Sequence, residues 1–224
     1  TLKTASQESA PKYVIGADFS QSGIAIDIMR AVERLDPGLK FVGHEQYRPF
    51  ARIQAHLERG ALDVFFGIAK TPRQEQRFIF IEPPLYFMGD AFYVRANDAI
   101  TVNSLDDIRK TGEGVLAWEG TIQHNYVLQQ GLNLAGSAKS IELGLKMLLG
   151  GRGRFWYGNE MSTSAEIREL KLEGQIRQAH LNHISGRYLA VSKTLDDQAK
   201  RRLSAALASL EQQGELDRIF LKYC

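Results

Sequence analysis

The chain has 224 residues, 44% of them hydrophobic and 24% charged, which is the balance of an ordinary globular protein with one domain or two. Its net charge of +2 gives no electrostatic reason to expect nucleic acid or an anionic membrane as a partner, and no apolar stretch has the length of a bilayer span. The single cysteine, Cys224, excludes an intramolecular disulfide and a thiolate metal cluster.

The first residues carry little structural signal. The segment Thr1 to Pro11 is polar and rich in small side chains, and we expect a loose lead-in there. The chain begins without methionine and without an apolar signal region, which removal of a signal peptide would explain.

Strands and helices then alternate. Apolar residues recur at helical spacing from Ile24 to Leu35, and a second helix is expected from Pro49, which suits a first helical position. Three apolar runs around these helices predict strands: Tyr13 to Ala17, Leu39 to Val42, and Leu62 to Ile68. This order predicts a parallel sheet covered on both faces.

A second set of alternating elements follows a long strand-like run, Leu85 to Arg95. Its expected helices begin at Ser104, Thr121, Ser140 and Ser164, and its expected strands are Val115 to Trp118, Arg154 to Tyr157 and Gln175 to Leu181. The strand Tyr188 to Ser192 and a helical stretch broken near Gly214 complete the chain. We therefore expect two α/β lobes, residues 1–95 with 190–224 and residues 97–187, joined by a two-strand hinge.

The most informative segment runs from Gly60 to Phe80. An aspartate, Asp63, opens a fully apolar strand that stops in a turn containing Lys70 and Thr71. In an open α/β sheet, ligands bind where strands end and helices begin. We therefore expect Ile68 to Gln74 to hold a small molecule.

Five stretches of the chain share the motifs of one protein family. They are Gly23 to Met29, Gly60 to Phe80, Phe80 to Tyr86, Ser104 to Ile108 followed by Val115 to Thr121, and Tyr188 to Lys193 followed by Leu210 to Ile219. In order and spacing they resemble the bacterial periplasmic solute-binding proteins of family 3, the amino-acid-binding type. The resemblance implies the type II periplasmic binding fold, which has two α/β lobes, each a mostly parallel sheet flanked by helices, closing on a ligand.

The chain departs from that family at three positions that concern the ligand. The family arginine that grips an α-carboxylate corresponds to Gln74, and the family acid that pairs with the α-amine corresponds to Asn159. The loop expected after the first strand, which carries an aromatic cover in the family, is shortened to Asp18 to Gly23. These neutral amides predict a small carboxylate or polar ligand in preference to a standard α-amino acid, with Lys70 or Arg73 as a replacement cation.

Ten residues are candidates for ligand contact because they lie near predicted strand ends or match family positions. They are Phe19, Ala69, Lys70, Thr71, Gln74, Tyr86, Trp118, Gly120, Thr121 and Asn159. The alternative interpretation is a set of capped turns and core aromatics. His180 and His183 are three apart in an expected strand and so face opposite sides, which argues against a metal pair. We expect no metal, no cofactor and no catalytic residue.

The resemblance implies a monomeric, non-enzymatic binding protein of the bacterial periplasm that delivers its ligand to the permease of an ABC transporter. A ligand-sensing domain of a membrane signalling system is the first alternative. A dehydratase-like enzyme on the same scaffold is the second, with Glu119 and Glu160 as the carboxylates nearest the expected cleft.

Overall fold

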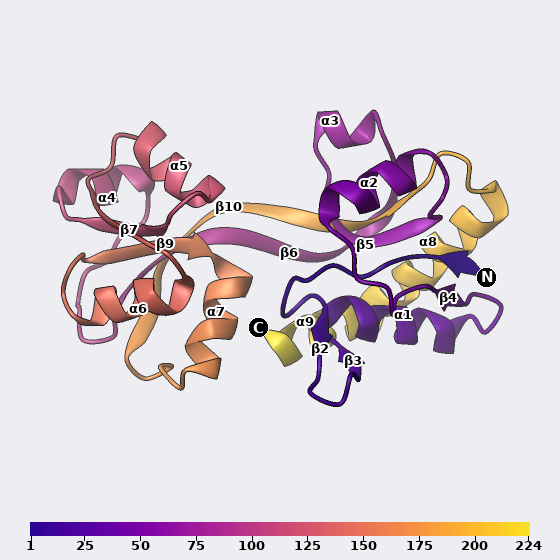
Figure 1. The fold of residues 1–224 in the computed structure, drawn as a ribbon, viewed down its shortest axis with the longest axis horizontal. Helices are drawn as coiled ribbons and strands as arrows, with labels where there is room; N and C mark the ends of the chain where they lie inside the picture. The colour runs from indigo at the N-terminus through magenta and orange to yellow at the C-terminus, as the bar shows by residue number, and fades with distance from the viewer. The chain divides into compact units, whose positions relative to one another are not determined.

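The computed structural model describes residues 1–224 and contains nine helices and ten strands (Figure 1). The chain forms two compact units, residues 1–87 with 185–224 (unit 1) and residues 88–184 (unit 2). Strands β6 (Ile79–Arg95) and β10 (Ile176–Val191) each contribute residues to both units. No helix combines the length and the hydrophobicity that a membrane span requires.

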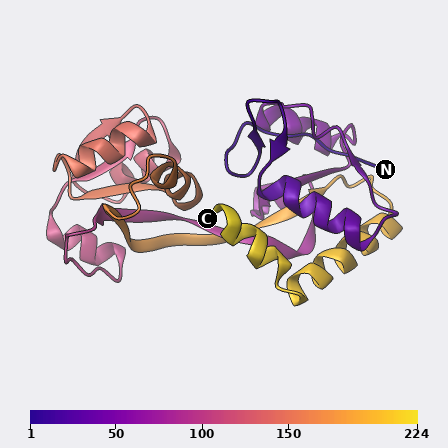
Figure 2. The same cartoon turned by 90° about the horizontal axis from the view of Figure 1, so that it is seen from below.

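Unit 1 is built on two short parallel strands and one longer strand. β1 (Leu2–Lys3) pairs in parallel with β4 (Phe41–Val42), and β5 (Val64–Ala69) pairs antiparallel with β10. Its helices are α1 (Ile24–Leu35), α2 (Phe50–Glu58), α3 (Pro72–Glu75), α8 (Asp197–Gln212) and α9 (Glu215–Tyr223). Figure 2 shows α1 lying beside α8 and α9, where the apolar stripe of α1 is buried. The predicted helix from Ile24 to Leu35 is confirmed.

The expected lead-in at the N-terminus is wrong. Leu2 and Thr4 donate backbone hydrogen bonds to Lys40 and Val42, at 2.7 and 2.8 Å, and Thr4 and Ser6 are buried polar residues. Because this strand has only two residues and small polar residues follow it, composition alone could not identify it. The expected first strand, Tyr13 to Ala17, is reduced to β2 (Val14–Ile15) in a hairpin with β3 (Gln21–Ser22).

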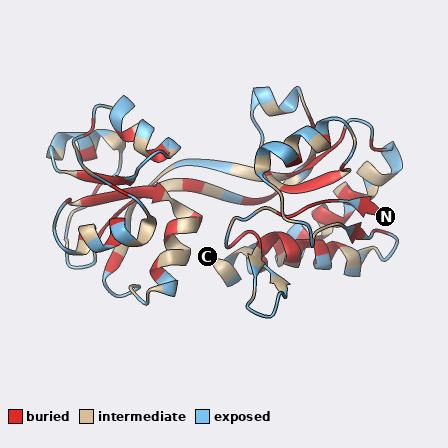
Figure 3. Cartoon of the chain, viewed as in Figure 1, coloured by how far each residue is buried: buried red, intermediate tan, exposed pale blue.

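Unit 2 is a sheet with a core on each face. β7 (Val115–Trp118) pairs in parallel with β8 (Leu134–Ala138) and β9 (Phe155–Asn159), and β9 pairs antiparallel with β6. Successive strand residues point to opposite faces, so Tyr157 joins one core cluster while Trp156 joins the other. Figure 3 shows the resulting buried strands between more exposed helices. The helices are α4 (Leu105–Thr111), α5 (Ile122–Gln129), α6 (Ile141–Leu149) and α7 (Glu160–Glu169).

The helix caps predicted in unit 2 are confirmed, whereas two boundaries and one strand differ. The hydroxyl oxygens of Ser104 and Ser140 accept hydrogen bonds from the third residue of α4 and α6, at 3.2 and 3.1 Å. Helix α7 begins at Glu160 instead of Ser164, because Asn159 caps it. β8 was not predicted because its residues are mostly small, and the two strands expected between Gln175 and Ser192 form one strand, β10.

Candidate functional site

A cavity of about 180 Å³ lies in unit 2 at the carboxyl ends of β7 and β9. Three residues predicted from the sequence, Trp118, Thr121 and Asn159, line it together. Both tryptophans of the chain, Trp118 and Trp156, are part of its wall, the first 40% exposed and the second buried. Because parallel sheets present ligand sites at the carboxyl ends of their strands, this cavity is the candidate half-site of unit 2.

Two helix N-termini open at this cavity. The Thr121 hydroxyl oxygen accepts a hydrogen bond from the His124 amide at 3.2 Å and its proton is donated to the Trp118 carbonyl at 2.6 Å. Gly120 turns the chain into α5 with a φ of 78°, a backbone conformation that side chains disfavour. The remaining first-turn amides of α5 are donors suited to an anionic or polar ligand group.

The Asn159 side chain caps α7 with its oxygen, which accepts a hydrogen bond from the Ser162 amide at 3.0 Å. Its Nδ2 donates to no protein group, so an N–H donor remains for a ligand. The neighbouring Glu160 has a raised pKa because burial penalises its charged form. The side-chain amide of Gln123 donates a 2.8 Å hydrogen bond to the Asp90 carboxylate, which restrains the Gln123 side chain in the wall of this cavity.

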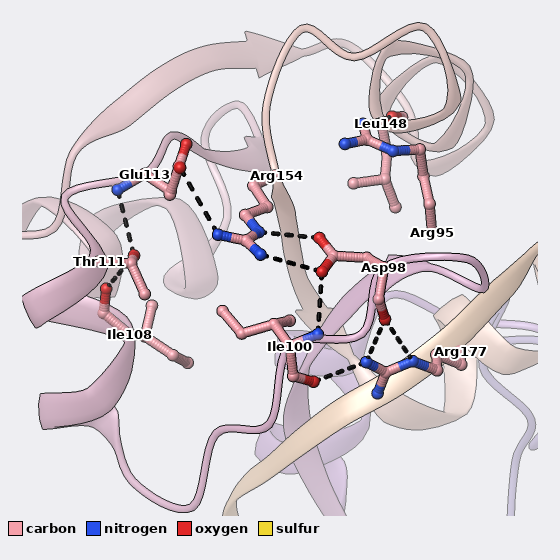
Figure 4. Close-up of polar contacts among 9 residues, drawn as sticks. All are labelled: Arg95, Asp98, Ile100, Ile108, Thr111, Glu113, Leu148, Arg154 and Arg177. Carbon is pink, nitrogen blue, oxygen red and sulfur yellow. Dashed lines mark hydrogen bonds and ion pairs between the residues drawn. The ribbon is translucent and has the colours of Figure 1, made fainter.

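A larger cavity in unit 2, about 710 Å³, lies at the opposite, amino ends of the strands, beside Gly114, Asn133 and Arg154. Three of its charged groups, Arg154, Asp98 and Glu113, pair with one another, as Figure 4 shows. The Arg154 guanidinium holds the pKa of the Asp98 carboxyl near 2. Position and pairing both indicate a structural network here.

Unit 1 has its own cavity, of about 470 Å³, between the end of the β1 segment and the start of α2. Its lining residues are Gln7, Glu8, Tyr47, Arg48, Pro49 and Phe50. The Tyr47 hydroxyl is enclosed and has no hydrogen-bond partner within the protein. A buried donor without a partner is uncommon in a folded protein, and Tyr47 is one of the residues that line this cavity. We take this cavity as the candidate half-site of unit 1.

None of these six residues was predicted as a ligand contact. Gln7 and Glu8 lie in the segment expected to be a loose lead-in, and Phe50 follows Pro49, where the second helix was expected to begin. They come together because the bridge between Ser6 and Tyr47 extends the pairing of β1 with β4. This pairing is non-local, so no single stretch of sequence carried the signal.

The strand end predicted to bind ligand, Ile68 to Gln74, contains a capped turn in which the charge of Lys70 is paired. The Thr71 hydroxyl caps α3 by accepting from the Gln74 amide at 3.2 Å. The Lys70 ammonium lies 3.0 Å from a Glu82 carboxylate oxygen and 3.9 Å from one of Glu75, and the bond to Glu82 raises its pKa. Lys70 is therefore already compensated, which weakens it as a replacement for the family's arginine.

The two remaining predicted aromatics lie apart from the lining of the unit 1 cavity. Tyr86 is 7% exposed and stacks on Phe220 with 5.6 Å between ring centroids. Phe19 is 87% exposed in the turn of the β2–β3 hairpin, with a φ of 62°. Their roles as ligand contacts stay predictions. His180 and His183 both lie on β10 and contact different rings, those of Phe92 and Tyr126.

One charged residue behind the unit 1 cavity was missed. Lys12 is only 7% exposed, and its ammonium donates to the Gly67 carbonyl at 2.9 Å and to the Gln7 side-chain oxygen at 3.4 Å. Burial, and secondly the charge of Arg187, lower the pKa of Lys12 to about 7. A lysine between Pro11 and the apolar run Tyr13 to Ile15 is the sequence signal that could have identified it.

Comparison with known families identifies the family to which the chain belongs. Residues 2–224 match the bacterial extracellular solute-binding proteins, family 3. The chain belongs to this family. Family 3 proteins are extracytoplasmic binding proteins and not enzymes, and the α/β fold predicted from the sequence is confirmed. No curated protein sequence matches the chain.

Solved structures of family 3 type share the fold at low sequence identity. The L-cystine solute receptor of Neisseria gonorrhoeae, unliganded and open, has a TM-score of 0.83 and 18% identity, covering 99% of this chain and 91% of its own. A substrate-binding domain of an amino acid ABC transporter from Streptococcus pneumoniae has a TM-score of 0.79 and 19% identity, covering 99% and 98%. A histidine kinase sensor domain similar to periplasmic binding proteins has a TM-score of 0.66 and 21% identity, covering 99% and 96%.

Proposed function

We propose that this protein is a periplasmic solute-binding protein that captures a small polar ligand and delivers it to the permease of an ABC transporter. The observation that carries the proposal is the family match over residues 2–224. A cavity in each unit, one of them at the carboxyl ends of parallel strands, supports it. We further propose that the protein acts as a monomer and that its two units, which we expect to correspond to the lobes predicted from the sequence, close on the ligand.

The ligand class follows from the groups at the two half-sites. An amino acid, an amino-acid-like compound or a small carboxylate would suit donors such as the Asn159 Nδ2 and the first-turn amides of α5. Asn159, which lines the unit 2 cavity, and Gln74, which lies outside both cavity linings at the position of the family's arginine, are neutral amides. They favour a small carboxylate or polar ligand over a standard α-amino acid. An unpaired ligand charge in a dry site would be costly, so these two positions discriminate.

Native mass spectrometry tests the proposal directly. Protein purified without denaturation should show an added mass of a small polar compound, which denaturation releases and identifies. The tryptophan fluorescence of the same protein should respond when that compound is added back, since both tryptophans line the unit 2 cavity. A Trp118→Phe variant should lose the exposed part of that signal and keep binding. Absence of a retained mass, together with no response to amino acids or carboxylates, would overturn the proposal.

A sensor role is the second candidate, and the structural likeness to a histidine kinase sensor domain is the observation that favours it. Carrier and sensor share the same ligand chemistry. Adjacent permease and ATPase genes would favour transport, whereas fusion to a membrane-anchored kinase or cyclase would favour sensing.

A further inference from the structure

Lys12 is a buried cation without a counter-charge. Its side chain packs against the Phe65 ring, with the ammonium nitrogen 4.5 Å from the ring centroid. Its two hydrogen-bond acceptors, the Gly67 carbonyl and the Gln7 amide oxygen, are both neutral. No carboxylate comes within ion-pairing distance of it. A buried ammonium in this condition is costly unless an anion joins it.

The groups around Lys12 do not supply that anion. Arg187 on β10 contributes a positive charge that lowers the pKa of Lys12, and Cys224 contributes a negative charge that acts on Tyr86. The nearby phenols of Tyr13 and Tyr86 have pKa values raised by burial, so they stay neutral. The loop ahead of α2 contributes Tyr47 and Arg48, the latter bonded to His56 at 2.6 Å and Gln46 at 2.5 Å, neither of them an acid. Glu8 is the one acid on the cavity wall. None of these groups forms an ion pair with the Lys12 ammonium.

Gln7 connects Lys12 to the cavity. Gln7 is one of the residues that line the cavity, and its side-chain oxygen accepts a hydrogen bond from the Lys12 ammonium at 3.4 Å. The ammonium is thus bonded directly to a residue of the cavity wall. Charges interact more strongly in a low-dielectric interior than in water, so the buried Lys12 ammonium would attract an anion bound in the cavity. Lys70 cannot act in the same way because two carboxylates already pair with it.

We propose that Lys12 makes the unit 1 cavity selective for a ligand that carries an anionic group, and that Lys12 gains a proton when this ligand binds. This inference rests on the proposed solute-binding function and names the charge of the ligand. Lys12 acts as a specificity-determining residue, through Gln7, at the cavity wall.

The lowered pKa of Lys12, about 7, gives the proposal a measurable signature. Near neutral pH a substantial part of the free protein holds Lys12 uncharged. A bound anion favours the ammonium and raises the pKa of Lys12, so binding takes up a proton. Affinity for an anionic ligand then falls as the pH rises above 7, whereas affinity for a neutral ligand of the same shape does not.

The test uses two pairs of probes that differ by one charge at nearly equal size: L-glutamate with L-glutamine, and succinate with succinamate. Calorimetric titrations in phosphate and in Tris at pH 8 report the protons taken up, because the two buffers differ in ionisation enthalpy. The wild type should prefer the more anionic member of a pair by about tenfold or more and take up most of a proton on binding it.

Variants separate charge from structure. Lys12→Met should lose both the preference and the proton uptake. Lys12→Arg, which cannot deprotonate in this range, should keep the preference and lose the uptake. Lys3→Met, at an exposed position, is the matched control and should behave as the wild type. Equal binding of both members of each pair by the wild type, or proton uptake that survives in Lys12→Met, would overturn the inference.

If Lys12→Arg fails to fold, NMR of the wild-type protein measures the protonation of Lys12 directly. Carbon-13 labelling of the lysine side chains lets NMR follow each lysine separately. One resonance, absent in Lys12→Met, should titrate with a midpoint near pH 7, and the anionic probe should move this midpoint to higher pH. Retention of a neutral or cationic compound in native mass spectrometry would leave the binding function standing and reject this inference. Failure to bind any solute would reject both.

Discussion

Asp98 and Arg154 form a bidentate ion pair in unit 2, with Nε–Oδ2 and Nη2–Oδ1 distances of 2.8 and 3.0 Å. The Asp98 backbone carbonyl also accepts two hydrogen bonds from Arg177, at 3.2 and 2.6 Å, so one residue ties β10 to the turn after β6 (Figure 4). Two separate guanidinium groups therefore fix this turn.

The pair predicts a loss of stability in acid. The folded-state pKa of Asp98 is about 2, below its usual value of 3.8, so the pair stabilises the fold above pH 4 and loses this contribution as the pH falls toward 2. Asp98→Asn should cost about 1–2 kcal/mol at pH 7, and the difference from wild type should shrink in acid. Urea unfolding at pH 7, 4 and 3 measures it. Glu142→Gln, in an exposed pair on α6, should cost much less.

Burial of Lys12 should give the free energy of unfolding a second pH dependence, at higher pH than that of Asp98. Its folded-state pKa, about 7, lies below the ordinary 10.5, so between these values the unfolded chain binds more protons and stability rises with pH. Below pH 7 the full cost of the buried charge is present. Lys12→Met should raise the free energy of unfolding by several kcal/mol at pH 6, on the order of 1.4 kcal/mol for each pKa unit, and by less at pH 9.5. A constant difference across this range would contradict the assignment, and Lys3→Met should leave the pH profile unchanged.

Gly144 predicts an overpacking defect in unit 2. A Cβ at this position of α6 would lie 2.0 Å from the Trp156 ring, so the helix packs directly on the indole. Glycine to alanine within a helix normally adds about 1 kcal/mol of stability, but here the clash should cost about 1–3 kcal/mol. Gly174→Ala, where a Cβ meets nothing within 4 Å, is the control. Thermal unfolding and the Trp156 emission should both change in Gly144→Ala alone.

The sequence predicted those parts of the fold whose signals are local. Helix α1 shows its apolar stripe over twelve residues, and the caps Ser104 and Ser140 precede their helices directly. β1 was missed because it has two residues and its surroundings are small and polar. The same applies to β8, in which only Leu134 is a large apolar residue.

The candidate site also contains residues that the sequence predicted and residues that it missed. Trp118 and Thr121 lie where a strand ends or a helix begins, Thr121 and Asn159 were chosen through the family resemblance, and the structure brings all three to one cavity. The unit 1 cavity depends on the pairing of Ser6 with Tyr47, which are far apart in sequence. Burial of Lys12 depends on Gly67 and Phe65 in another strand, and no local pattern reports such contacts.

Ligand binding should reduce the dimensions of the protein in solution. If the two units close on the ligand, as we propose, the radius of gyration from small-angle scattering should fall at saturation with the compound that native mass spectrometry identifies. A compound of similar charge that does not bind is the control. An unchanged radius at proven saturation would contradict closure and leave binding itself intact.

Gln74 and Asn159 should determine affinity through single hydrogen bonds. Losing one bond to a charged ligand group costs about 1.5–3 kcal/mol, roughly ten- to a hundredfold in affinity. Gln74→Ala and Asn159→Ala should each show this loss in calorimetry with the identified ligand, and Thr71→Ala should show it if its hydroxyl also reaches the ligand. Gln212→Ala, exposed near the end of α8, should have no effect.

Asn159→Asp keeps the cap of α7 because a carboxylate oxygen can accept from the Ser162 amide. It removes the free N–H donor and adds a negative charge, so it should weaken an anionic ligand more than Asn159→Ala does. Tight binding of an ordinary amino acid with Gln74→Ala and Asn159→Ala both silent would show that the ligand is held elsewhere.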